Sequence, residues 1–130
     1  MKLTSSIICL VALFSVPASC IITATHNSKY DNGAKSINTV TCSSNLKARY
    51  PTLGKLPTKK IGGLIGAPCG TCWAINYDKA IVYALSIDKS DEGFQLSNDA
   101  VVALTAGKKQ TLPGNLQITV TAADKALCGL

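Results

Sequence analysis

The cysteines constrain the fold of this chain more than any other feature of its sequence. Six cysteines occur in 130 residues, and two of them, Cys9 and Cys20, belong to an apolar N-terminal segment. The remaining four are Cys42, Cys69, Cys72 and Cys128. In an exported chain an even set of cysteines indicates structural disulfides, here two. The residues alone leave the three possible pairings open.

The spacing of Cys69 and Cys72 raises two chemical alternatives. A C-x-x-C pair serves redox chemistry when a helix begins at it and lowers the pKa of a thiol. Residues 73–77 (WAINY) are typical of a strand instead. A zinc site needs two such pairs, whereas Cys42 and Cys128 stand alone. We therefore expect structural bridges, no metal and no cofactor.

The N-terminal segment has the layout of a secretory leader. An apolar stretch over residues 7–17 follows a single lysine and precedes small residues. It is shorter than the roughly 20 residues of a membrane span, and no second apolar run of that length follows. The sequence predicts a signal peptide at 1–20 and one domain at 21–130, secreted to the extracellular space. Alternative cleavage points are Ala18 and Ala24, and the alternative to cleavage is a membrane anchor.

Composition narrows the class of protein further. Hydrophobic residues make up 47% of the chain and charged residues 15%, which excludes a disordered or collagen-like chain. Thirteen Lys and Arg against seven Asp and Glu give a net charge of +6. Because these charges form no dense basic run, we expect no nucleic-acid partner. We interpret the lysines as solvated loop charges, with attraction to an acidic wall surface as the alternative.

The pattern of apolar residues predicts several short strands and one helix. Residues 72–77 and 80–87 form a predicted hairpin around Asp78 and Lys79, and the second run is apolar on both faces, as in a central strand. A further strand alternates over 116–122, with inward positions Leu116, Ile118, Val120 and Ala122. Shorter strands are expected at 37–41 and around Ile61. A helix is expected from Ser97 or Asn98 to Leu104 or Thr105, with Gly107 at its end. These elements describe a small β-barrel with a helical insert. We expect the protein to be a monomer.

Five segments carry a family resemblance. They are Lys29–Asn32, Ser36–Cys42, Cys69–Trp73 (CGTCW), Ser86–Asp88 and the terminal Cys128–Leu130 (CGL). Together they resemble the cerato-platanin family of secreted fungal proteins, over roughly residues 24–130. The resemblance implies a mostly β fold, a six-stranded double-psi β-barrel with short helices, like the first domain of expansins. It also implies the two disulfides Cys42–Cys69 and Cys72–Cys128.

The same resemblance implies a function. It points to a non-catalytic, cell-wall-associated protein that binds chitin-type oligosaccharides, loosens polysaccharide as expansins do and elicits plant defence. The implied partners are cell-wall polysaccharide or chitin oligomers and a host plant surface receptor. Two alternatives stay open. One is a weak glycoside-cleaving enzyme that uses Asp88 with Asp31, and the other is a surface-active protein whose effect is independent of sugar.

Four residues are candidates for carbohydrate contact. They are Tyr30, Asp31, Tyr77 and Asp88. A tyrosine ring can stack on a sugar and donate a hydrogen bond, and Asp88 ends an apolar strand, where it can reach a surface groove. The alternative for Asp88 is a carboxylate that bonds backbone amides. Because hydrolysis requires two carboxyls at a set spacing, which the sequence does not give, no residue is assigned as catalytic. We expect Trp73 and Tyr83 to be core residues and His26 to be exposed.

Overall fold

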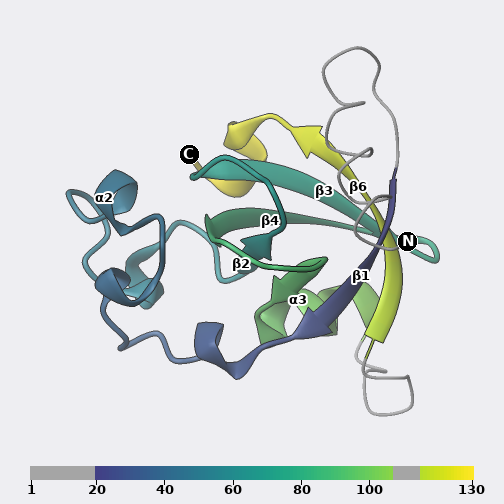
Figure 1. The fold of residues 1–130 in the computed structure, drawn as a ribbon, viewed down its shortest axis with the longest axis horizontal. Helices are drawn as coiled ribbons and strands as arrows, with labels where there is room; N and C mark the ends of the chain where they lie inside the picture. The colour runs from purple at the N-terminus through teal and green to yellow at the C-terminus, as the bar shows by residue number, and fades with distance from the viewer. Residues whose placement is uncertain (1–19, 107–114) are drawn as a thin grey trace.

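A closed six-stranded β-barrel forms the body of the protein in a computed structural model that describes residues 20–106 and 115–130 (Figure 1). The strands are β1 (Cys20–His26), β2 (Ile61–Leu64), β3 (Thr71–Tyr77), β4 (Ala80–Asp88), β5 (Phe94–Leu96) and β6 (Asn115–Ala123). Around the barrel they follow the order β1-β5-β2-β4-β3-β6. Two neighbouring pairs, β1 with β5 and β2 with β4, are parallel, and the other pairs are antiparallel. The predicted mostly β, six-stranded barrel is confirmed.

Short helices connect and cover the strands. They are η1 (Ser28–Tyr30), η2 (Ile37–Thr39), α2 (Ser43–Leu46), η3 (Leu53–Lys55), α3 (Asn98–Thr105) and η5 (Lys125–Cys128). Of the two predicted helix caps, Ser97 and Asn98, the structure has Ser97, whose side chain accepts a hydrogen bond from the backbone N–H of Ala100. The helix ends at Ala106 in the left-handed conformation, whereas the expected stop, Gly107, lies outside the described residues.

The predicted hairpin is present and its second strand is central. Tyr77 pairs with Ala80 across a two-residue turn, in which Asp78 adopts a positive φ of 54° that aspartate tolerates better than most residues. Strand β4 lies between β2 and β3. Apolar side chains are buried on both of its faces, as the continuous apolar run indicated.

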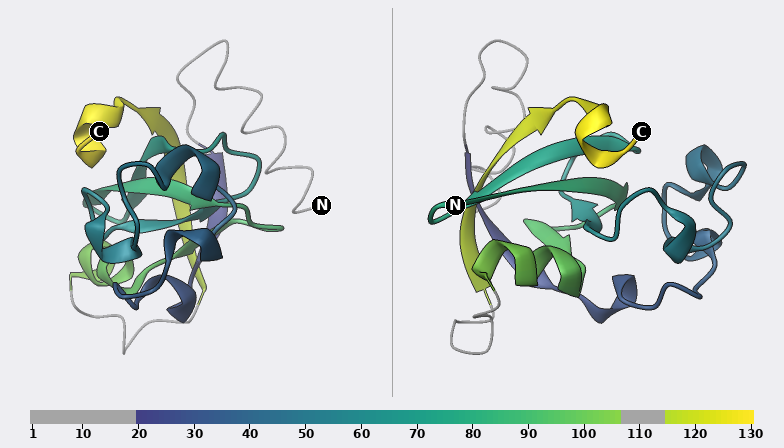
Figure 2. Two further views of the ribbon diagram at one scale, coloured as in Figure 1. Left: turned by 90° about the vertical axis from the view of Figure 1, so that its left-hand side faces the viewer. Right: turned by 180° about the vertical axis from the view of Figure 1, so that it is seen from behind.

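Two hydrophobic clusters hold the molecule together, one on each side of the barrel wall. Inside the barrel, Trp73, Phe94 and Ile118 pack with the buried side of α3. Outside it, Leu85 and Ile87 of β4 pack under a loop-rich segment. We call this segment, residues 28–60, the loop lobe; it lies at one end of the barrel, at the left of Figure 1 and facing the viewer in the left panel of Figure 2.

Backbone contacts give the loop lobe a fixed shape without a sheet. Gly54 donates a backbone hydrogen bond of 2.8 Å to Gly33, and a Cβ atom on Gly54 would lie 2.9 Å from the Gly33 carbonyl oxygen. A single bridge joins Ser36 to Thr52. The expected strand at 37–41 is therefore wrong: the chain forms η2 instead, because the Ser36 hydroxyl accepts from the N–H of Asn38 and turns the backbone.

Side-chain burial confirms most of the predicted core and corrects part of it. Trp73 is buried in the barrel cluster, and Leu116, Ile118 and Val120 point inward. Ala122, which was expected inward, is exposed near the end of β6. Tyr83 is only partly buried, because it lies at the edge of the outer cluster. The interior alternation of β6 thus holds only along the central part of the strand.

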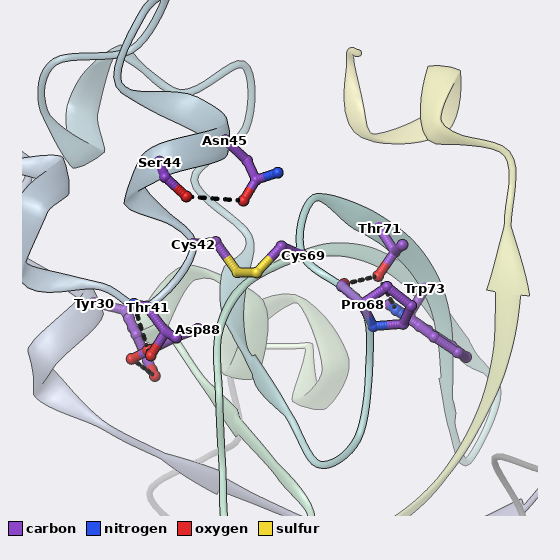
Figure 3. Close-up of a disulfide and its surroundings, with 10 residues drawn as sticks. All are labelled: Tyr30, Thr41, Cys42, Ser44, Asn45, Pro68, Cys69, Thr71, Trp73 and Asp88. Carbon is purple, nitrogen blue, oxygen red and sulfur yellow. Dashed lines mark hydrogen bonds between the residues drawn. A yellow bond between two sulfur atoms is a disulfide. The ribbon is translucent and has the colours of Figure 1, made fainter.

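The disulfides follow the pairing that the family resemblance implied. Cys42 is bonded to Cys69 (Figure 3), and Cys72 is bonded to Cys128. The first bridge fastens the loop lobe to the loop before β3, and the second fastens η5 to β3. A redox bridge between Cys69 and Cys72 is excluded, because each sulfur has another partner. Within the residues that the structure describes, no helix is long and apolar enough to cross a membrane.

Residue Cys20 opens β1, where it pairs with Val120. The predicted leader otherwise falls on residues 1–19, outside the described part of the chain, and its boundary stays a prediction. Ala24 is buried in the middle of β1, so cleavage after Ala24 would remove most of a barrel strand.

Candidate functional site

The most densely hydrogen-bonded side chain at the lobe end of the barrel is Asp88, the last residue of β4. One carboxylate oxygen accepts from Lys29 Nζ at 2.7 Å and from the Tyr30 hydroxyl at 2.9 Å. The other accepts from the backbone N–H of Thr41 at 2.8 Å and from its hydroxyl. All three donor residues belong to the loop lobe, and Figure 3 shows two of them, Tyr30 and Thr41, converging on the carboxylate. Asp88 therefore docks the lobe onto the barrel.

The electrostatics of Asp88 favour its charged form. Burial of the side chain, 4% exposed, raises its pKa, but the donors from Lys29, Thr41 and Tyr30 outweigh burial and lower the pKa to about 2. Burial, followed by the adjacent carboxylate, raises the pKa of Tyr30 above its ordinary value. The pair is thus fixed as an ionised acid and a neutral phenol across the neutral pH range.

This arrangement corrects the sequence-based picture of Tyr30 and Asp88. Both were expected at a sugar-binding surface, yet both are buried, and every hydrogen bond named above is internal. The alternative reading of Asp88, a strand-end carboxylate that bonds backbone amides, is the one that the Thr41 N–H contact supports. A glycosidase acid must hold a proton near neutral pH, and a carboxyl with a pKa of about 2 does not.

Acid should weaken the folded state through Asp88. Its pKa is depressed from 3.8 to about 2 on folding, so its stabilising contribution is complete above about pH 4 and is lost as the pH falls through about 2. The shift corresponds to about 2 kcal/mol of unfolding free energy. Urea unfolding at several pH values should show this loss in the wild type. Over the same pH interval the unfolding free energy of Asp88→Asn should fall less. An equal dependence of unfolding free energy on pH in both proteins would show that Asp88 is not the group responsible.

An open cleft of about 420 Å³ lies beside this cluster, between the loop lobe and the start of α3. Polar groups along it include Asp31, Lys59, Asn98 and Asp99. The close approach of Gly33 and Gly54 forms part of its wall, and the buried residues Tyr30, Leu53 and Ile61 lie behind its lining. Charged, amide and apolar groups in one concave site are the usual composition of a small-ligand site.

Asp31, one of the residues predicted to contact carbohydrate, lines the cleft and holds two of its neighbours in place. One carboxylate oxygen accepts from the backbone N–H of Asn98, the first residue of α3, at 2.7 Å. The other lies 2.6 Å from His26 Nε2. The carboxylate therefore complements the positive end of the α3 dipole and positions one wall of the cleft. His26 is exposed, as expected, and it partners this carboxylate.

Tyr77 lies away from the other candidates. It pairs with Ala80, the first residue of β4, whereas Asp88 is the last residue of that nine-residue strand. A strand of this length separates them by about 26 Å. Tyr77 is instead half-buried against the barrel core, so it does not share a site with Asp31.

Sequence reasoning did not find Lys29, Thr41, Lys59 or Asp99. Lys29 precedes Tyr30 and Thr41 precedes Cys42, so each stands beside a residue that was singled out, but nothing in the local sequence distinguishes their side chains. Among the described residues no group of three His, Cys, Asp or Glu side chains could hold a metal ion.

A family model and several curated proteins match the sequence of this chain. The family model for cerato-platanin matches residues 22–130. Allergen Asp f 15 of Aspergillus fumigatus is 32% identical, over 82% of this chain and 76% of its own. The heat-stable 19 kDa antigen of Coccidioides immitis is 26% identical, over 89% and 86%.

Solved structures of similar proteins have the same fold. Cerato-platanin 2 from M. perniciosa superimposes with a TM-score of 0.76 at 31% identity, over 85% of this chain and 99% of its own. The solution structure of the fungal elicitor cerato-platanin superimposes with a TM-score of 0.71 at 24% identity, over 82% and 96%. With the matched sequence model, the shared barrel and the two bridges, this chain belongs to the cerato-platanin family.

Proposed function

We propose that the protein is secreted, associates with cell walls and binds chitin-type oligosaccharides in the cleft between the loop lobe and α3, without cleaving them. The observation that carries the proposal is the composition of the cleft in a member of this family. Lys59, Asn98 and Asp99 offer donors and acceptors for sugar hydroxyl and acetamido groups. Leu53 and Ile61 are buried behind this lining, so the polar side chains and the glycine backbone are the groups that a sugar would contact.

The absence of cleavage is part of the proposal, and two carboxylates support it. Asp88 is ionised and its oxygens accept from the loop lobe. Asp31 uses both oxygens to hold His26 and the first turn of α3. Neither group is placed as a general acid or as a nucleophile, so binding energy in the cleft would loosen contacts between polysaccharide chains rather than break a bond.

We further propose that the protein elicits plant defence through a host surface receptor. One structural relative is described as a fungal elicitor, and the same barrel is present here. The sugar-independent alternative differs in one consequence. If recognition requires bound sugar, Asp99→Asn should weaken oligosaccharide binding and elicitation together in a leaf-infiltration assay; equal elicitation by both proteins would favour the sugar-independent route.

Titration with soluble N-acetylglucosamine oligomers should locate the site. We expect amide NMR shifts at Gly54 and Asn98 at millimolar ligand, and none at Asp78, in the distant hairpin turn. Asp99→Asn should weaken binding by about fivefold or more through the loss of a charge-assisted hydrogen bond. Asp78→Asn removes the same charge outside the cleft and is the matched control.

Two results would contradict this proposal. The first is an absence of shifts around the cleft at millimolar oligomer. The second is a release of new reducing ends that is lost in Asp88→Asn, which would make the protein a glycosidase.

A further inference from the structure

Charge is distributed unevenly between the two parts of the molecule. The loop lobe contains seven basic residues and one acid, Asp31, a formal charge of +6. The rest of the described chain contains three basic and six acidic residues, a formal charge of −3. The lobe occupies one end of the barrel (Figure 2), so the protein presents a positive end and a weakly negative body.

Most of the basic side chains in the lobe are available to a partner. They are Lys29, Lys35, Lys47, Arg49, Lys55, Lys59 and Lys60. Within the described residues Lys29 has a carboxylate partner, Asp88, and none of the other six forms an ion pair. Lys47, Arg49, Lys55 and Lys59 are exposed. Like charges gathered without counter-charges destabilise the lobe, and a polyanion would relieve that repulsion.

The backbone that carries these charges is held in place. Leu53 donates a 3.0 Å hydrogen bond to the carbonyl of Lys35, which brings the segment of Lys55 beside it. Lys47 donates to Ser43 at 2.8 Å and Arg49 to Leu46 at 3.1 Å, at the end of α2. The bridge at Cys42 ties the same region to the loop before β3. The charges therefore belong to a shaped surface rather than to a basic tail.

We infer that the loop lobe is a docking surface for a carboxylated polysaccharide, a linear polymer of uronic acid. This inference is distinct from the proposed chitin-type ligand of the cleft, to which the lobe contributes one base, Lys59. Exposed hydroxyl and amide side chains lie among the lysines, and they can bond sugar hydroxyls: Ser36, Asn38, Thr39, Ser44 and Asn45. Six of the seven bases are lysines, which act as single hydrated charges and attract an anionic polymer without requiring one fixed bidentate geometry.

A lipid surface fits the lobe less well. The large exposed hydrophobic side chains of the described chain are Ile21, Ile81, Val102 and Leu127, all outside the lobe. Interfacial membrane binding combines basic charge with apolar insertion, and the lobe presents only the charge. A uronic acid polymer requires charge and hydrogen bonds alone.

Polygalacturonate is the probe for this surface, and binding is measured by calorimetry on the full mature protein at low salt. We expect K47Q/R49Q to weaken binding by about tenfold. The matched control K79Q/K125Q removes two exposed charges outside the lobe and should change binding by less than about twofold. The difference should disappear at high salt, because exposed charges are then screened.

Other ligands test whether binding to the lobe is specific for a carboxylated polysaccharide. Neutral hydroxyethyl cellulose should not bind through the lobe, and K47Q/R49Q should retain wild-type binding of N-acetylglucosamine oligomers, which keeps this test distinct from that of the cleft. Equal losses in the two double variants, no binding of polygalacturonate, or tighter binding to phosphatidylserine vesicles or duplex DNA would each overturn the inference.

Discussion

Replacing Cys72 and Cys128 together with alanine is expected to lower the free energy of unfolding by about 4 kcal/mol. The bridge joins residues 56 positions apart in sequence, so it removes much chain entropy from the unfolded state. It also anchors η5 against β3, and both cysteines are buried in the outer cluster. Because a small domain has only about 5–15 kcal/mol in total, the variant should unfold at a far lower urea concentration.

The second bridge provides the comparison. Cys42 and Cys69 are 27 positions apart, and the shorter loop predicts a loss smaller by about 0.6 kcal/mol when both are replaced by alanine. Fluorescence of Trp73, the single tryptophan and a buried barrel residue, reports unfolding in both variants. A loss below about 1 kcal/mol for the Cys72 and Cys128 variant would show that the bridge does not constrain the unfolded chain as the entropy argument requires.

Asp88→Ala is expected to cost about 3 kcal/mol of unfolding free energy. The substitution leaves the buried Tyr30 hydroxyl and the Thr41 N–H without their acceptor and Lys29 without its counter-charge. Unpaired buried donors are costly because water no longer satisfies them. The damage should centre on the docking of the loop lobe, so amide exchange should rise at Thr41 and Cys42 before it rises in the barrel strands.

Two further variants separate the parts of this cluster. Tyr30→Phe removes one donor and keeps the ring, so it should cost about 1 kcal/mol. Asp88→Asn keeps the shape but loses the charge, so it should fall between the other two variants. If Asp88→Ala were as stable as the wild type, or if its exchange rose uniformly over the barrel, Asp88 would not be the group that docks the lobe.

Long-range contacts and burial explain why the sequence predicted only part of the candidate site. The residues that contact Asp88 are 47 to 59 positions away along the chain, and their side chains meet only because the lobe folds back on the end of β4. Tyr30 was a reasonable surface candidate by residue type, but the outer hydrophobic cluster buries it. Lys59 precedes β2 and Asp99 follows β5, yet both line the same cleft.

Local patterns were reliable where the physics is local. The hairpin at Asp78, the cap at Ser97 and the two-sided burial of β4 depend on neighbouring residues, and all three were predicted correctly. The strand expected at 37–41 failed because a serine cap overrode β propensity. Propensity is a weak preference, and a satisfied backbone hydrogen bond can outweigh it.

By itself the sequence determined the residues available for two bridges, the class of the fold and most of its strands, because alternation and turn chemistry act over a few residues. The tertiary structure decided which sulfurs meet, which acid is buried and where a cleft opens. Those outcomes depend on contacts between distant segments, and only closure of the barrel brings such segments together.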